Sequence, residues 1–299
     1  MNSLAPSEFI LNHNGSIYHL NLLPENLADT VILVGDPDRV ERVSKHFDKI
    51  EFSLRKREFV THTGTYRGKR ISVVSTGIGT DNIDIVLNEL DALVNIDFSS
   101  RTVKKERRSL DIVRIGTSGA IQGDIPVDSF LRGDMGLGFD SLLHYYQYDN
   151  QEHRELEEAL AAHLQLSPKH SVPYFVSGSS ELASLFTGSE VIGGMTGTNV
   201  GFYGPQGRVL RLRLQDPDLN RKIESFSFKG QKITNLEMET AGIYGLAQLL
   251  DHRALSMNAI VANRITGEFS ADPKKTVDRL IEFTLEKLTT AAPESHSPQ

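Results

Sequence analysis

The stretch Thr30-Val31-Ile32-Leu33-Val34-Gly35-Asp36-Pro37-Asp38 joins a short apolar run to a glycine and then to residues that start helices. The β-branched run predicts a buried strand over 30–34. Asp36 is a good N-cap and Pro37 a good first helical residue, so a helix is expected over about 37–46. A strand, a glycine turn and a helix in this order are typical of α/β proteins.

The same order of features returns further along the chain. An apolar run over 71–75 leads into a glycine turn at 76–79 and a helix over about 82–95, and a strand over 111–115 leads into a glycine turn at 116–119. Further strands are expected near 172–177, 190–196, 208–214, 231–236 and 255–262, and helices near 151–165, 240–251 and 274–291. The pattern predicts a single α/β domain with a largely parallel sheet, whose ligands bind beyond the carboxyl ends of the strands.

Composition narrows the class of protein. The 299 residues are 39% hydrophobic and 24% charged, with a net charge of −7 and no cysteine. Disulfides, thiolate catalysis and cysteine-based metal sites are therefore excluded, and bulk nucleic-acid binding is disfavoured. No apolar run approaches the roughly 18 residues of a membrane span, the N-terminus lacks the pattern of a secretory signal, and the histidines lack paired metal-ligand spacing. We expect a cytoplasmic protein with no metal site and neither nucleic acid nor membrane as partner.

The first candidate site is a cradle for an anion. Gly35 lets the backbone approach a ligand near a helix N-terminus, and Arg39 lies one turn into that helix. Arg114, near the end of an apolar strand, needs an acid or an anion as partner, and Thr117 adds a hydroxyl donor. Each arginine taken alone is also compatible with a surface ion pair.

The second candidate site is the loop Phe202-Tyr203-Gly204-Pro205-Gln206-Gly207-Arg208. Phe202 offers a ring face, while Gln206 and Arg208 offer an amide and a cation, as a planar heterocycle with carbonyl edges would require. Asn263-Arg264, after the strand expected at 255–262, could add polar recognition. The alternatives are a structural turn for the loop and a strand-ending turn for Asn263-Arg264.

A third feature is the carboxylate pair in Glu237-Met238-Glu239. In an extended segment Glu237 and Glu239 face one side and Met238 the other. Two like charges that close repel unless donors lie between them, and a sugar with adjacent hydroxyls would supply such donors. The competing interpretation is a helix entrance, where the helix dipole favours acids.

In this order the motifs resemble those of the nucleoside phosphorylases of the trimer-of-dimers type, and the uridine-cleaving branch in particular. The resemblance runs from about Tyr18 to Leu288. The blocks that carry it are Gly35-Asp36-Pro37-Asp38-Arg39-Val40, Arg57-Glu58-Phe59, Ser75-Thr76-Gly77-Ile78-Gly79, Arg114-Ile115-Gly116-Thr117-Ser118-Gly119-Ala120 and Glu237-Met238-Glu239. It implies a single three-layer α/β/α domain over 1–299 with a mixed, largely parallel central sheet. The N-terminal extension (1–17) and the tail (291–299) are expected to be flexible.

The resemblance also implies a role for individual residues. Phosphate, a co-substrate, would be held by Gly35, Arg39, Arg114, Thr117 and a neighbouring subunit's copy of Arg57. The ribose would be held by Glu237, Met238, Glu239 and a neighbouring copy of His19. The base would be held by Ser118, Gly119, Phe202, Gln206, Arg208 and Arg264, with catalysis carried by Arg208, Gln206, Glu239 and Arg114.

Asn263 bears on the choice of nucleobase. Purine-cleaving relatives carry an aspartate here, which protonates the purine, whereas Asn263 has no proton to supply. Uracil leaves as an anion spread over its carbonyls, so the cation of Arg208 and the amide of Gln206 suffice. The implied activity is reversible phosphorolysis of uridine to uracil and ribose 1-phosphate in pyrimidine salvage, by a glycosyltransferase that needs no cofactor.

Two departures from the bacterial pattern concern assembly. The loop Thr80-Asp81-Asn82 stands where close relatives often have Gly-Pro-Ser and hold a monovalent cation with a glutamate aligned with Glu58. The segment 97–110 is longer than in the shorter bacterial enzymes. A homo-oligomer is expected, either a hexamer or a dimer. A purine nucleoside phosphorylase, a hydrolytic nucleosidase and a non-catalytic nucleoside-binding protein are the alternatives.

Overall fold

The computed structural model describes residues 3–149 and 151–290, and the tail at 291–299 lies outside the described residues. The helices are α1 (Pro37–Ser44), α2 (Thr80–Asn95), α3 (Arg154–Leu164), α4 (Ser180–Leu185), α5 (Leu219–Ser225), α6 (Thr240–Leu249) and α7 (Pro273–Thr290). Short 3-10 turns are η1 (Pro24–Asn26), η2 (Leu142–Tyr145), η3 (Gln151–His153) and η4 (Gly204–Gln206). None of the helices in the described parts of the chain combines the length and apolar character that a bilayer crossing requires.

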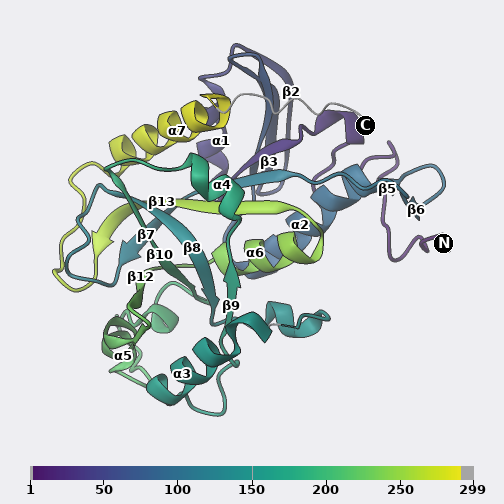
Figure 1. Ribbon diagram of the computed structural model, residues 1–299. Helices are drawn as coiled ribbons and strands as arrows, with labels where there is room; N and C mark the ends of the chain where they lie inside the picture. Colours follow the sequence, from purple (N-terminus) through teal and green to yellow (C-terminus); the bar gives the residue numbers. More distant parts are fainter. Residues whose placement is uncertain (1–2, 150, 291–299) are drawn as a thin grey trace.

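One mixed sheet runs through the molecule (Figure 1). Its strands are β1 (Thr30–Val34), β2 (Lys49–Lys56), β3 (Phe59–Tyr66), β4 (Lys69–Ser75), β7 (Asp111–Ala120), β8 (Phe130–Gly138), β9 (Tyr174–Ser177), β10 (Val191–Thr198), β11 (Ser227–Phe228), β12 (Gln231–Glu237) and β13 (Arg253–Asn263). They follow the order β11-β12-β10-β8-β13-β7-β1-β4-β3-β2, with β9 paired to β8. A separate small hairpin joins β5 (Ile96–Asp97) to β6 (Thr102–Val103).

The two faces of strand β1 show how the sheet lies between two layers of helices. Strand β1 lies between β4 and β7, parallel to both, and every one of its residues is buried. Val31 and Leu33 pack into the core cluster that contains the apolar faces of α2 and α6. Ile32 and Val34 pack into the opposite cluster, which contains those of α1 and α7. The alternation of side chains along one buried strand thus places helices on both faces of the sheet.

The far end of β7 brings distant segments together. Beyond β1 the strand continues and pairs antiparallel with β12, matching Gly119 with Leu236 and Ala120 with Asn235. Strand β12 also pairs with β10 in parallel, so the sheet curls back on itself at this end. The curl places the end of β7 beside the end of β12, which is followed shortly in the chain by α6.

Three expectations differ from the structure. Gly116–Gly119 is part of β7 and not a turn, because these residues pair with β13 and β12. Residues 208–214 form no strand and run as an irregular loop. The N-terminal extension packs against the body as far as the structure describes it, with Phe9 and Ile17 buried in the core. The hairpin of β2 and β3, strand β8 and helices α4 and α5 were not expected.

The basic segment over 101–108 makes structural contacts with the rest of the chain. The Arg101 guanidinium lies over the ring of Phe9, 5.0 Å from its centroid, and donates to the carbonyl of Phe9. Arg107 pairs with Asp251 at 3.3 Å, and Arg108 pairs with Asp29. The segment therefore fastens the N-terminal residues to the body, and its charges are partly neutralised within the chain.

Gly136 on β8 sets how closely α6 approaches the sheet. A Cβ atom at this position would lie 2.9 Å from the Cα atom of Ala241 in the first turn of α6. We expect Gly136→Ala to lower the free energy of unfolding by about 1–3 kcal/mol through overpacking. Urea denaturation measures this change, with Gly188→Ala as the control because its Cβ would meet nothing nearer than 3.9 Å. Equal stability of the two variants would contradict the close packing.

Candidate active site

A cavity of about 720 Å³ opens at the carboxyl ends of the central strands. Its walls come from the residues that follow β1 and β4 and from the ends of β7, β12 and β13. Twelve residues that the sequence indicated line it together: Gly35, Arg39, Arg114, Thr117, Ser118, Gly119, Phe202, Gln206, Arg208, Glu237, Met238 and Glu239. The three candidate sites are therefore parts of one cavity.

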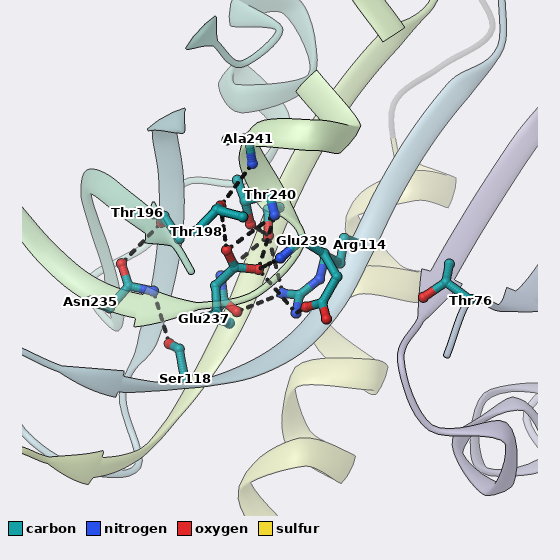
Figure 2. A network of polar contacts seen from close by, with 12 residues as sticks. Thr76, Arg114, Ser118, Thr196, Thr198, Asn235, Glu237, Glu239, Thr240 and Ala241 are labelled. Carbon is teal, nitrogen blue, oxygen red and sulfur yellow. Dashed lines mark hydrogen bonds and ion pairs between the residues drawn. The ribbon is translucent and has the colours of Figure 1, made fainter. Parts of the chain in front are cut away.

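The carboxylate pair binds an arginine, Arg114, that also lines this cavity (Figure 2). The Arg114 Nη2 atom lies 2.5 Å from Glu239 Oε2 and 3.1 Å from Glu237 Oε2. Its Nη1 atom donates to Asn258 Oδ1 at 2.8 Å. The donor between the two carboxylates is therefore a side chain of the protein itself, the Arg114 guanidinium. Burial alone would lower the pKa of Arg114, but the two carboxylates outweigh burial and raise it.

Gly116 makes the position of Arg114 possible. The two residues lie on the same face of β7, two positions apart, and the guanidinium folds back over the glycine. A Cβ atom at Gly116 would lie only 1.9 Å from Arg114 Nη1. Gly116 therefore leaves room for the Arg114 side chain and does not form a turn.

The two carboxylates differ in how many bonds they already accept. Glu237 accepts from the Thr198 hydroxyl at 2.7 Å and from the backbone N–H groups of Glu239 and Thr240, at the start of α6. Glu239 accepts from the Gly79 N–H at 2.8 Å and from Arg114. Since an ionised carboxyl offers about four acceptor sites, Glu239 keeps more capacity for a ligand than Glu237. Burial and the charge of Glu237 raise the pKa of Glu239, while Arg114 opposes this rise.

The competing interpretation of this motif as a helix entrance is also correct for Glu237, which caps the start of α6. Met238 lines the same cavity as both carboxylates, although strict alternation placed it on the opposite side. The reason is that the extended geometry ends at Glu237, and Glu239 already precedes the helix with φ −138° and ψ −29°.

Arg39 adds a second cation to the cavity and makes no ion pair within 3–149 and 151–290. Its Nη1 atom donates to the Ile115 carbonyl at 3.0 Å, while its Nε atom is buried and has no partner among the described residues. Burial, with the nearby charge of Arg114, lowers the pKa of Arg39 to about 10. A buried cation without full compensation favours an anionic ligand beside Arg39.

Arg208 adds a third cation to the cavity. Its guanidinium lies over the Phe202 ring at 3.8 Å from the centroid, and its Nη1 atom donates to Gln206 Oε1 at 2.8 Å. Burial and the charge of Arg264 lower the pKa of Arg208 to about 10. Gln206 is buried and lies in η4, which ends at the left-handed Gly207. The expected stacking face, amide and cation are therefore adjacent, although Arg208 covers the ring face.

Arg264 and Asn263 lie behind the cavity wall. Arg264 does not line the cavity, and its side chain packs near Gly119, where a Cβ would lie 3.4 Å from Arg264 Cγ. The Asn263 amide donates to the carbonyls of Gln122 and Ile125, both at 2.9 Å. The structural interpretation is thus correct for Asn263.

His19 and Arg57 lie outside the cavity of their own chain. His19 is bound to Glu89, and Arg57 is exposed at a left-handed backbone position with φ 58°. Glu58, beside Arg57, does line the cavity, next to Gly77.

Several contributors escaped sequence reasoning, among them Thr198, Ser256 and Asn258. Ser256 and Asn258 are fully buried on β13, two positions apart, and both accept hydrogen bonds from Arg114 Nη1. Polar residues at alternate positions within an apolar strand were the sequence signal that could have indicated these two residues.

A second cavity of about 690 Å³ shares Arg208 with the first and is lined mainly by apolar side chains such as Phe139 and Leu214. Of these two cavities in the described part of the chain, the first brings the buried carboxylates Glu237 and Glu239 together with Arg39 and Arg114.

Fold and cavity define an α/β protein with a polar ligand site at the carboxyl ends of its strands. Comparison with known proteins gives the family. The model of the phosphorylase superfamily matches residues 29–292, and the chain belongs to this superfamily. The family supports a nucleoside phosphorylase, an enzyme that transfers pentosyl groups.

Individual relatives differ in substrate. A uridine phosphorylase from Thermococcus kodakarensis is 30% identical over 268 residues, which cover 87% of this chain and 82% of that protein. A DeoD-type purine nucleoside phosphorylase from Shewanella loihica is 28% identical over 277 residues, or 91% and 98% of the two chains. A Trypanosoma brucei nucleoside phosphorylase, described as showing uridine phosphorylase activity, superposes with a TM-score of 0.85 at 29% identity, covering 95% of this chain and 100% of that one.

Proposed function

We propose that the protein catalyses the reversible phosphorolysis of uridine to uracil and ribose 1-phosphate, as part of pyrimidine salvage. One observation carries the proposal: the same cavity has cations at Arg39 and Arg114, an acceptor at Glu239 and a cation with an amide at Arg208 and Gln206. Phosphate, ribose hydroxyls and a pyrimidine need these three chemistries.

In the reaction, a phosphate oxygen forms a bond to C1′ while the bond from C1′ to N1 of the base breaks. The electron pair of that bond moves onto the base and spreads over its carbonyls. Arg39 and Arg114 hold phosphate, Glu239 accepts from the ribose hydroxyls, and Arg208 stabilises the leaving anion. Catalysis then rests on positioning and preorganised charge.

Asn263 favours a pyrimidine over a purine in this proposal. Its amide is occupied by two backbone carbonyls, and its oxygen accepts from the N–H groups of Ile265 and Thr266. It supplies no proton to a leaving purine, whereas a uracil anion needs only the donors of Arg208 and Gln206.

The proposal includes a second copy of the chain. His19 and Arg57 lie away from their own cavity, and they would complete the sugar and phosphate sites of a neighbouring subunit. Lys56 donates to the carbonyl of Tyr18, so the segments that carry His19 and Arg57 are fastened to each other. A dimer or a trimer of dimers satisfies this arrangement.

A base-release assay tests the proposed reaction. Uridine, thymidine, cytidine and inosine are each incubated with the enzyme, with and without phosphate, and free base is followed by chromatography. We expect uracil from uridine only when phosphate is present. Release without phosphate would indicate a hydrolytic nucleosidase, preferential cleavage of inosine a purine nucleoside phosphorylase, and tight uridine binding without turnover a nucleoside-binding protein.

A further inference from the structure

Glu89, on α2, binds the segment that carries His19 through four contacts. Its Oε1 atom lies 2.7 Å from His19 Nδ1 and accepts from the His19 backbone N–H at 2.9 Å. Its Oε2 atom accepts from the backbone N–H groups of His19 at 3.1 Å and Leu20 at 2.8 Å. One carboxylate thus fixes both the backbone and the ring of His19.

This contact determines which nitrogen of the imidazole is available. An ionised carboxylate only accepts hydrogen bonds, so the Nδ1 atom of His19 carries the proton that it donates to Glu89. In the neutral ring the Nε2 atom then has a free lone pair and can accept from a hydroxyl. The same logic orients histidines in metal sites, where a carboxylate on one nitrogen fixes the role of the other.

The ring is also held in place by its neighbours. The centroid of the His19 ring lies 4.7 Å from that of Tyr18 and 6.4 Å from that of Phe59, both in edge-to-face geometry. The His19 side chain keeps 28% of its surface exposed, while Glu89 keeps 12%. These contacts fix the orientation of the imidazole, which remains partly exposed.

We propose that Glu89 is a positioning residue that holds His19 with Nε2 as acceptor for the 5′-hydroxyl of a nucleoside bound to a neighbouring copy of the chain. The inference rests on the proposed function, because it requires that His19 contacts that sugar. Glu89 touches no substrate and acts only through His19.

The experiment compares uridine with 5′-deoxyuridine, which lacks the hydroxyl that His19 would bind. The measured quantity is the ratio of kcat/KM for the two nucleosides at saturating phosphate, in the full-length protein. We expect Glu89→Gln to lower this ratio about tenfold, because the amide has one acceptor oxygen and cannot satisfy all three N–H groups. Asp84→Asn, a matched change on the same helix, is expected to leave the ratio unchanged.

A His19→Ala background separates positioning from general damage. If Glu89 acts through His19, adding Glu89→Gln to His19→Ala leaves the ratio where His19→Ala alone puts it. An equal loss on both nucleosides in Glu89→Gln, with the ratio intact, would overturn the inference and leave the proposed function standing. If the wild-type protein releases no uracil from either nucleoside in phosphate, the proposed function fails and the inference with it.

Discussion

Replacing Arg114 with methionine is expected to lower the free energy of unfolding by about 3–5 kcal/mol, the range found when one partner of a buried ion pair is removed. Arg114 is 5% exposed and contacts Glu237 and Glu239, which are 3% and 4% exposed. Without the guanidinium, two buried carboxylates face each other with no cation between them. We expect the proposed phosphorolysis to be lost as well, since Arg114 is one of the proposed phosphate ligands.

The loss should depend on pH. Arg114 opposes the rise in the pKa of Glu239, so its removal raises that pKa further. A carboxyl whose folded pKa exceeds its unfolded value of about 4.3 contributes stability that is fully present below the unfolded pKa and is lost as pH rises through the folded pKa. The destabilisation in Arg114→Met should therefore be smaller at pH 5 than at pH 8.

Urea denaturation at pH 5 and pH 8 measures both the loss of unfolding free energy and its dependence on pH. Arg221→Met is the matched control, because Arg221 pairs with Asp218 at 3.2 Å on the surface, where such a bond contributes about 0–1 kcal/mol. A loss in Arg114→Met no larger than in Arg221→Met would show that the central cluster does not hold the fold together.

The sequence predicted the central layers well because buried strands carry strong local signals. The run at 30–34 is apolar and β-branched, and its glycine, N-cap and proline fall where the structure starts α1. Asp36 accepts from the Asp38 N–H at 3.0 Å, as an N-cap should. Each of these features depends on residues close together in the chain.

Gly116–Gly119 shows where local reasoning fails. A glycine-rich tetrapeptide after an apolar run is typical of a turn, yet these residues continue β7. They do so because β13 and β12 supply ladder partners that lie more than a hundred residues away in the sequence. Gly116 is needed for a close contact, because a Cβ there would lie 1.9 Å from Arg114 Nη1, whereas a Cβ at Gly119 would lie 3.4 Å from Arg264 Cγ, an ordinary contact distance.

The sequence indicated many of the residues that line the cavity, although not how they contact one another, and three residues it also indicated, His19, Arg57 and Arg264, do not line it. Residue types at the strand ends indicated Arg39, Arg114 and Glu239, and all three line one cavity. That Arg114 binds the carboxylates directly depends on how β7 and β12 approach in space, which no sequence spacing encodes. The loop at 208–214 alternates leucine with arginine like a strand, but the structure pairs it with no neighbouring strand among the described residues.

Removing the guanidinium in Arg208→Ala is expected to lower kcat for uridine about 10²–10³-fold, or about 2.7–4 kcal/mol of transition-state stabilisation, by analogy with the loss of one oxyanion donor. Arg208 lines the cavity and donates to Gln206 and to the Phe202 carbonyl. Its positive charge matters most when the base departs as an anion, so kcat should fall more than the affinity for uridine. Steady-state kinetics with Arg211→Ala as the matched exposed control measure this effect.

The leaving group offers a sharper test of the same residue. 5-Fluorouridine releases a base whose anion is more stable than that of uracil, so it needs less help from a cation. If Arg208 stabilises the departing base, Arg208→Ala should lose less kcat on 5-fluorouridine than on uridine, whereas a residue that only shapes the cavity would lose the same factor on both. Arg208→Lys should recover part of the loss, because it keeps the charge but not the forked donors. Wild-type turnover of uridine by Arg208→Ala would assign the base to another part of the cavity.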